Sequence, residues 1–364
     1  MHYIVSAYGA GNLGDNAIFT GVRKEFSNSI QIYANVPSHQ PNIWYADVIE
    51  NGFPELNEDC ELIIGGGGIF YSEQATKDLF TLVKRALERN MKISIRKVGT
   101  EYLSYTWVPW AKKVCDAAYF VSTRSRKSAE ILKSIGVKDV IVERDYAYNL
   151  TKEDANVEDI EFPTFNNSRP IIGIITGGNL SGLEKVVQII KFLLTDYGIG
   201  DTMCNVVHIP HTRHYVSPQG NDVVTGEMLW SMIDIYHDAR YERFKLLPFP
   251  ETDLKLLNAY TKVHGILGMR YHSFVFSEII EKPLLGFTSG LKAKTYFEET
   301  NRKKYELGDE KSRVGYCDSI GVEESLDVIL RAVMYFVAYV KGNFRVENEL
   351  TEKFFEEIRL GGRL

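Results

Sequence analysis

Short apolar runs alternate with longer amphipathic segments through most of the chain. In the first half, the apolar runs predict strands at 3–7, 30–33, 61–64, 92–95, 118–122 and 140–142. Helices are predicted between them at about 15–26, 74–90 and 126–134. This alternation is typical of a parallel sheet whose strands are joined by crossover helices.

The pattern stops at 151–169 and then starts again. That stretch is acidic at first and continues into Pro163 and Asn166-Asn167-Ser168, so we expect a linker there. Strands are then predicted at 170–175, 205–209, 244–247, 263–267 and 283–287. Helices are predicted at 181–197, 225–240, 252–260 and from about 270, and two long helices, broken near Gly342-Asn343, occupy 322–360.

These elements predict an α/β protein with two Rossmann-like domains, at 1–155 and 168–322. The last helices, 323–364, are expected to brace the two domains. Ligands of such sheets bind at the carboxyl ends of the strands, and a cleft is expected between the two halves.

Composition excludes several classes of protein. With 45% hydrophobic and 25% charged residues the chain is not a disordered protein, and its net charge of −6 argues against a nucleic-acid partner. No apolar run is long enough for a transmembrane helix, and the first residues do not resemble a signal peptide. Four widely separated cysteines are expected to be reduced and mostly buried. We therefore expect a cytoplasmic protein.

Two glycine-rich loops follow predicted strands. Gly9-Ala10-Gly11-Asn12-Leu13-Gly14 matches G-x-G-x-x-G, but no acid ends the second strand and Asp15 would repel a pyrophosphate. A tight turn without ligand is the alternative. Four consecutive glycines, 65–68, are costly to order, so we expect close approach of a ligand or of the other domain there.

A third motif, Gly268-Met269-Arg270-Tyr271-His272-Ser273, lies between a strand and a helix. Arg270 and His272 would thus lie at a helix N-terminus, which favours anions. Arginine grips carboxylates and phosphates in a bidentate manner, and histidine exchanges protons near neutral pH. The alternative is that Arg270 pairs with an acid such as Glu278.

Histidines 208, 211 and 214 repeat every third residue after a strand. Because Pro210 opposes a helix, this spacing does not gather them on one face, so we predict no metal site. Instead, His208 and His211 are expected to line the cleft and to contact an acceptor sugar.

The order of these motifs resembles the polysaccharide pyruvyl transferase family over nearly the whole chain. The matching residues are 8–18, 63–70, Ser122-Thr123-Arg124, Asp145, 268–273, Lys282-Pro283-Leu284-Leu285-Gly286 and Lys292. Ser125 departs from the pattern, because the family usually has an acid after its first arginine.

The resemblance implies a fold like that of GT-B glycosyltransferases. It also implies transfer of the pyruvyl group of phosphoenolpyruvate onto two sugar hydroxyls as a cyclic ketal, with no cofactor or metal. The implied proton shuttle is His272, with Asp15 as a base or hydroxyl orienter. The implied donor-binding residues are Arg124, Arg270, Lys292 and Ser273. The acceptor side is expected to use Gly11, Asn12, Gly66, Gly67, Gly68, His208 and His211.

The expected acceptor is a surface polysaccharide or its lipid-linked precursor, which would place the protein at the inner face of a membrane. Two alternatives stay open. One is a glycosyltransferase of the same fold that uses a nucleotide sugar, and the other is a non-catalytic saccharide-binding protein.

Overall fold

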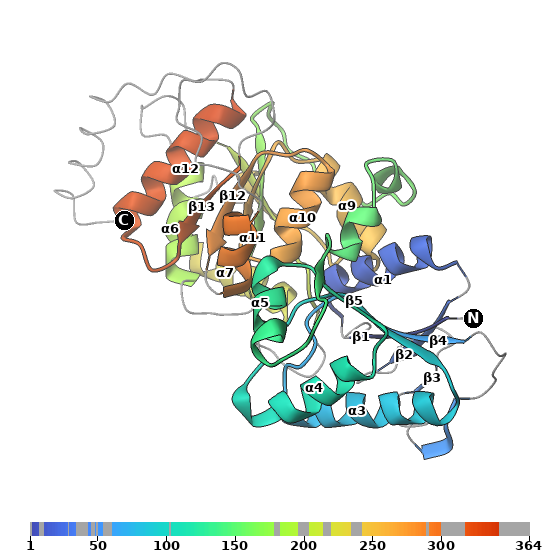
Figure 1. Cartoon of the computed structure of the whole chain (residues 1–364). Helices are drawn as coiled ribbons and strands as arrows, with labels where there is room; N and C mark the ends of the chain where they lie inside the picture. The colour runs from blue at the N-terminus through green and yellow to red at the C-terminus, as the bar shows by residue number, and fades with distance from the viewer. Residues whose placement is uncertain are drawn as a thin grey trace. The chain divides into compact units, whose positions relative to one another are not determined.

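The computed structural model divides the chain into two compact units, Met1–Leu150 and Thr151–Leu364 (Figure 1). It describes residues 2–6, 11–27, 29–33, 43–44, 48, 50–53, 60–101, 103–177, 183–195, 204–213, 220–233, 242–288, 291–299 and 317–341. The second of the two helices predicted over 322–360, the one after Gly342-Asn343, and His214 lie outside these residues.

The first unit is built on a parallel sheet of seven described strands in the order β3-β2-β1-β4-β5-β6-β7. The strands are β1 (His2–Ser6), β2 (Ser29–Tyr33), β3 (Ile43–Trp44), β4 (Glu61–Gly65), β5 (Lys92–Val98), β6 (Phe120–Thr123) and β7 (Ile141–Val142). Tyr3 of β1 pairs with Ile30 on one side and Leu62 on the other. Every residue of β4 is buried, as expected for a central strand covered on both faces.

Helices cover both faces of this sheet, with α1 on one side and α3 and α4 on the other (Figure 1). Their bounds, with that of α5, are α1 (Leu13–Glu25), α3 (Glu73–Glu88), α4 (Val108–Asp116) and α5 (Arg126–Ser134). Ser72 begins α3 by accepting a hydrogen bond from the Ala75 amide, and the buried stripe of α3 packs on β4 and β5. Each fully buried leucine of such a stripe contributes about 1.5–3 kcal/mol.

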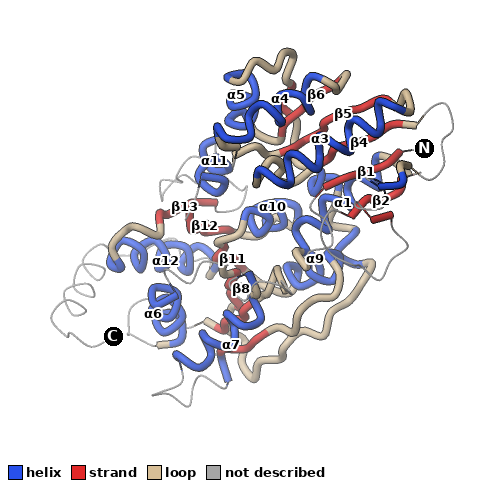
Figure 2. Tube along the Cα trace, turned by 90° about the horizontal axis from the view of Figure 1, so that it is seen from below, coloured by secondary structure: helices blue, strands red, loops and turns tan. Residues whose placement is uncertain are grey.

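The second unit repeats the plan with six described strands in the order β10-β9-β8-β11-β12-β13. They are β8 (Ile171–Ile175), β9 (Asn205–His208), β10 (Phe244–Leu246), β11 (Gly265–Gly268), β12 (Leu284–Thr288) and β13 (Cys317–Gly321). The helices are α6 (Leu183–Leu194), α7 (Asp222–Ile233), α9 (Asp253–Thr261), α10 (Tyr271–Ile279), α11 (Leu291–Glu299) and α12 (Leu326–Val340). Figure 2 shows α6, α7 and α12 on one side of the sheet and α9 and α10 on the other.

One part of this unit differs from the expected organisation. The segment predicted as a linker packs on α9, because Asn258 donates a hydrogen bond of 2.7 Å to the carbonyl of Ala155. Helix α12 buries Ile329, Val333 and Phe336 in the core of the second unit, and the expected bracing of the two domains stays a prediction. Helix α12 itself confirms the helix predicted after 322.

Both sheets reverse their strand order beside the first strand, between β1 and β4 and between β8 and β11. Such a reversal opens a crevice at the carboxyl ends of the two strands, where open α/β sheets bind ligands. The glycine-rich loops follow β1 and β4, and the Arg-x-His motif follows β11. Each predicted motif therefore lies at a switch point of its own sheet.

Candidate functional site

Arg270 begins helix α10 directly beyond β11. Ser273 donates its hydroxyl hydrogen to the carbonyl oxygen of Arg270 at 2.5 Å, which fixes the first turn. A Cβ at Gly268 would lie 2.3 Å from that hydroxyl oxygen, so only glycine fits at the end of β11. Ser273 is buried. Its side chain shapes the start of α10.

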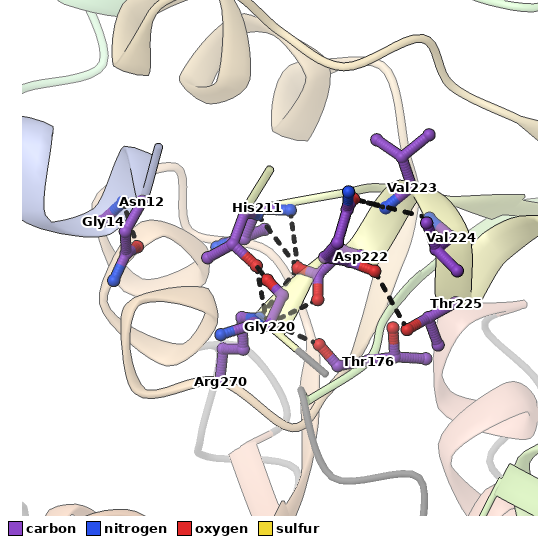
Figure 3. Close-up of polar contacts among 12 residues, drawn as sticks. Asn12, Gly14, Thr176, His211, Gly220, Asp222, Val223, Val224, Thr225 and Arg270 are labelled. Carbon is purple, nitrogen blue, oxygen red and sulfur yellow. Dashed lines mark hydrogen bonds and ion pairs between the residues drawn. The ribbon is translucent and has the colours of Figure 1, made fainter. Parts of the chain in front are cut away.

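The Arg270 guanidinium makes a side-on ion pair with Asp222 (Figure 3). Its Nε donates to Oδ2 at 2.8 Å and its Nη2 to Oδ1 at 2.5 Å. Nε also donates to the carbonyl of Thr176, and Nη2 donates to the hydroxyl of Thr212. Three strand ends therefore meet at Arg270, those of β8, β9 and β11.

Asp222 was not foreseen from the sequence, where Glu278 was the suggested partner. Glu278 instead accepts a hydrogen bond from Tyr296 at 2.9 Å. Asp222 lies 48 residues before Arg270 at the start of α7, and no motif connects the two positions. The sequence signal was only an acid at the beginning of a helix.

His208 and His211 lie beneath this ion pair, each 1% exposed. The His208 ring hydrogen-bonds the Thr176 hydroxyl at 3.0 Å, and the His211 ring hydrogen-bonds the Tyr260 hydroxyl at 2.8 Å. Burial is the main cause that lowers the pKa of His208 to about 4, and the Arg270 charge adds to it. Burial and Arg270 also hold the pKa of His211 well below its usual range.

Both rings are therefore neutral near pH 7 and closed to solvent. Neither ring is accessible in this structure, so their burial does not favour the expected contact with an acceptor sugar, which stays a prediction. His208 holds the hydroxyl of Thr176, whose carbonyl accepts a hydrogen bond from Arg270.

His272 and Lys292 lie at the carboxyl ends of β11 and β12, as the motifs predicted. His272 is buried in the first turn of α10, with its ring 5.2 Å from that of Tyr271. Lys292 lies in the first turn of α11, with Nζ 5.7 Å from the centre of the Tyr271 ring. The Tyr271 ring, which the sequence did not single out, thus lies close to both His272 and Lys292.

Arg124 lies in the first unit, directly after β6, and its side chain is 1% exposed. Nη1 lies 3.2 Å from an Asp145 oxygen and Nη2 lies 3.5 Å from a Glu101 oxygen. A Cβ at Gly99 would lie 2.5 Å from Nη2, so the guanidinium packs on bare backbone. Ser125 caps α5 instead of supplying charge. The acid missing after Arg124 is thus replaced by two acids from other loops.

The first glycine loop is arranged around Asn12. Its amide donates to Asp15 at 2.7 Å and its oxygen accepts from the Gly14 amide at 3.1 Å. Gly11 has a φ of 75°, a conformation that favours glycine. Asp15 therefore lies at the start of α1, on the β1 side of the switch point.

The second glycine run has a structural explanation inside the first unit for part of its length. Gly66 has a φ of 70°, and a Cβ there would lie 2.1 Å from a methyl carbon of Ile18. Gly67 has a φ of 69°, and its carbonyl accepts from the Gly99 amide at 2.7 Å. A Cβ at Gly68 would meet no atom of the described residues within 4 Å. Close packing against α1 thus explains the glycine at position 66, and the expected ligand contact stays a prediction.

Among the described residues, no group of three or more histidine, cysteine, aspartate or glutamate side chains is arranged to hold a metal ion.

Cys60, Cys115 and Cys204 are buried free thiols. In the described part of the chain, no helix is long and apolar enough to cross a membrane.

A family model described as polysaccharide pyruvyl transferase matches residues 12–290, which include every motif described above from Asn12 to Pro283. The chain belongs to this family. As a family member it is a transferase. No curated protein sequence is detectably similar to it.

Solved structures of other proteins share the fold of this pyruvyl transferase family member. UDP-GlcNAc 2-epimerase from Neisseria meningitidis, bound to UDP-GlcNAc, is 12% identical with a TM-score of 0.54, covering 99% of both chains. The enzyme of the same name from Methanocaldococcus jannaschii is 10% identical with a TM-score of 0.54, again covering 99% of both. Anabaena HepE in complex with UDP is 10% identical with a TM-score of 0.51 and covers 98% of each chain. This likeness confirms the predicted GT-B-like α/β fold class.

Proposed function

We propose that this protein transfers the pyruvyl group of phosphoenolpyruvate onto two hydroxyls of one sugar, forming a cyclic ketal and releasing phosphate. The observation that carries the proposal is the arrangement at the β8–β11 switch point. Arg270 and His272 begin α10 there, and Lys292 lies in the first turn of α11, next along the sheet. Two helix N-termini and two cationic side chains suit a small anion with a carboxylate and a phosphate.

The proposed reaction balances in two additions. A proton added to the methylene carbon makes the methyl group, and a sugar hydroxyl attacks the resulting cation-like carbon. Phosphate then leaves, and the second hydroxyl closes the ketal ring. One of the two hydroxyl protons replaces the proton given to carbon. The other is taken up by the departing phosphate. We propose His272 as the group that delivers the proton to carbon, a role typically worth about 10²–10⁴ in rate.

The proposed acceptor is a saccharide, in keeping with the family. We infer that it belongs to a surface polysaccharide or its lipid-linked precursor, the latter placing the protein at the inner membrane face. The buried free thiols support a cytoplasmic location, where thiols stay reduced. No cofactor enters the proposed reaction.

The first test is a thermal-shift panel with phosphoenolpyruvate, UDP, GDP, CMP and NAD. A ligand at about 100 times its dissociation constant stabilises the folded state by about 2.7 kcal/mol. Stabilisation by phosphoenolpyruvate supports the proposal. Stabilisation by a nucleotide alone would refute it in favour of a nucleotide-sugar glycosyltransferase.

The second test follows turnover with a panel of sugars. In D₂O, the proposed proton transfer places one deuterium in each product methyl group, which NMR detects. His272→Ala should lower turnover by about 10²–10⁴-fold. His264→Ala is the matched control, because His264 directly precedes β11 at its amino end and His272 follows the carboxyl end of the same strand. Full turnover in His272→Ala would remove His272 from the mechanism.

A further inference from the structure

Asp222 joins two elements of the proposed donor site, the loop after β9 and the start of α10. Its carboxylate is fully buried and accepts from two backbone amides, those of His211 at 2.9 Å and Thr212 at 3.0 Å. It also accepts both bonds of the ion pair with Arg270. The carboxylate thus ties the loop after β9 to the start of α10.

The loop is closed at its two ends around the same residue. The Asp222 amide donates to the Thr212 carbonyl at 2.8 Å, and the Thr212 hydroxyl donates to the Gly220 carbonyl. Arg213 and Asn221 form an antiparallel bridge one residue further out. Arg270 therefore contacts both ends of a closed loop, through Thr212 on one side and Asp222 on the other.

This clamp uses one edge of the guanidinium, the edge formed by Nε and Nη2. The bonds to Asp222, Thr212 and Thr176 use Nε and Nη2, and the Arg270 side chain keeps 20% of its surface exposed. Because the guanidinium is planar and rigid, fixing two of its nitrogens also fixes the direction of Nη1.

We propose that Asp222 is a positioning residue of the donor site. It acts through Arg270, presenting the Nη1 edge to an anionic group of the donor, and the inference rests on the proposed function for the identity of that donor. The pair also lowers the net positive charge of the pocket. Recognition of the anionic substrate by Arg270 then depends on the direction of the guanidinium N–H groups more than on a net positive charge.

The first experiment needs no donor. Hydrogen exchange of the Arg270 Nε–H is measured by NMR in the full chain. Asp222→Asn should raise the exchange rate by about tenfold or more, because the amide cannot accept both guanidinium bonds. Asp253→Asn is the matched control, since Asp253 is likewise a buried aspartate at the first position of a helix in the same unit. It should leave this rate unchanged.

The second experiment separates positioning from general support of the fold. Phosphoenolpyruvate affinity is measured by calorimetry in the wild-type protein, Asp222→Asn, Arg270→Lys and the double variant. Asp222→Asn should weaken affinity by about 10- to 100-fold in the wild-type background, as expected for directly contacting residues of one network. In the Arg270→Lys background, where no side-on pair exists, it should weaken affinity by less than about threefold.

Three results are decisive. An unchanged Nε–H exchange rate in Asp222→Asn overturns the proposal. Equal losses of affinity in both backgrounds also overturn it, because they would show that Asp222 acts independently of Arg270. Absence of phosphoenolpyruvate binding by the wild-type protein would refute the proposed function alone, since the exchange experiment decides the link between Asp222 and Arg270 without a donor.

Discussion

Replacing Arg124 with methionine distinguishes a structural role of this residue from the donor-binding role that the family resemblance implies. The side chains of Arg124, Glu101 and Asp145 are 1%, 2% and 0% exposed. Methionine removes the cation and leaves two carboxylates in the interior without their ion pairs. Breaking a buried ion pair costs about 3–5 kcal/mol, mostly because a charge remains buried without compensation.

The loss should appear in the first unit. At about 2–4 °C per kcal/mol for a unit of this size, the midpoint of its thermal unfolding should fall by about 6–20 °C. Hydrogen exchange read by mass spectrometry is the suitable assay, because it resolves the opening of each unit separately in the full chain. Peptides from β5, β6 and α5 should lose protection, whereas peptides from α10 and β11 should not.

Two further variants control this experiment. Arg126→Met changes a neighbouring exposed arginine at the start of α5 and should shift stability by no more than about 0.5 kcal/mol. Adding Glu101→Gln and Asp145→Asn to Arg124→Met removes the uncompensated charges and should recover much of the loss. If Arg124→Met kept full protection yet lost phosphoenolpyruvate binding, the structural interpretation would be refuted and a direct donor contact would be favoured.

Two other predictions concern stability. Burial lowers the pKa of His208 from 6.5 to about 4. Between these two pH values, the unfolded chain therefore binds up to one more proton at this residue than the folded chain does. The free energy of unfolding should therefore fall as pH drops from about 6.5 to about 4, by up to about 1.4 kcal/mol per pH unit, and urea titrations should show a shallower dependence in His208→Gln. Gly66→Ala should destabilise the first unit by about 1–3 kcal/mol, because its Cβ meets Ile18 at a positive φ. Gly68→Ala, with open space around it, should change stability by at most about 0.5 kcal/mol in the same urea assay.

Most of the sheet could be predicted from the sequence, because buried parallel strands are nearly continuous apolar runs. The exceptions have physical reasons. Strand β3 has only two residues, too few to show a period. Helix α4 was missed because Pro109 interrupts an aromatic stretch, yet this proline lies in the first turn, where its missing N–H costs nothing. Strand β13, with the sequence CDSIG, has no clear apolar alternation.

The candidate site could be predicted only where its residues are local in sequence. Arg270, His272 and Lys292 each follow a predictable strand, so their placement at one edge of the sheet followed from the motif. The partners of the arginines did not, because Asp222 and Asp145 lie 48 and 21 residues away from theirs. Likewise, the sequence spacing of the histidines carried no information on their burial.

These distant carboxylates bear on how the proposed donor would be bound. The family resemblance implies that Arg124 and Arg270 bind the anionic donor, in a protein whose net charge is −6. In the structure, Arg124 is paired with two buried acids and Arg270 with one. Under the proposed function, we expect the donor to be attracted by the aligned N–H groups at the starts of α10 and α11, by Lys292 and by the remaining guanidinium N–H groups of Arg270. Because the carboxylates fix the arginines before any donor arrives, little side-chain entropy remains to be lost on binding. In the proposed site, the buried acids lower the net positive charge but hold the arginine side chains in place before the donor binds.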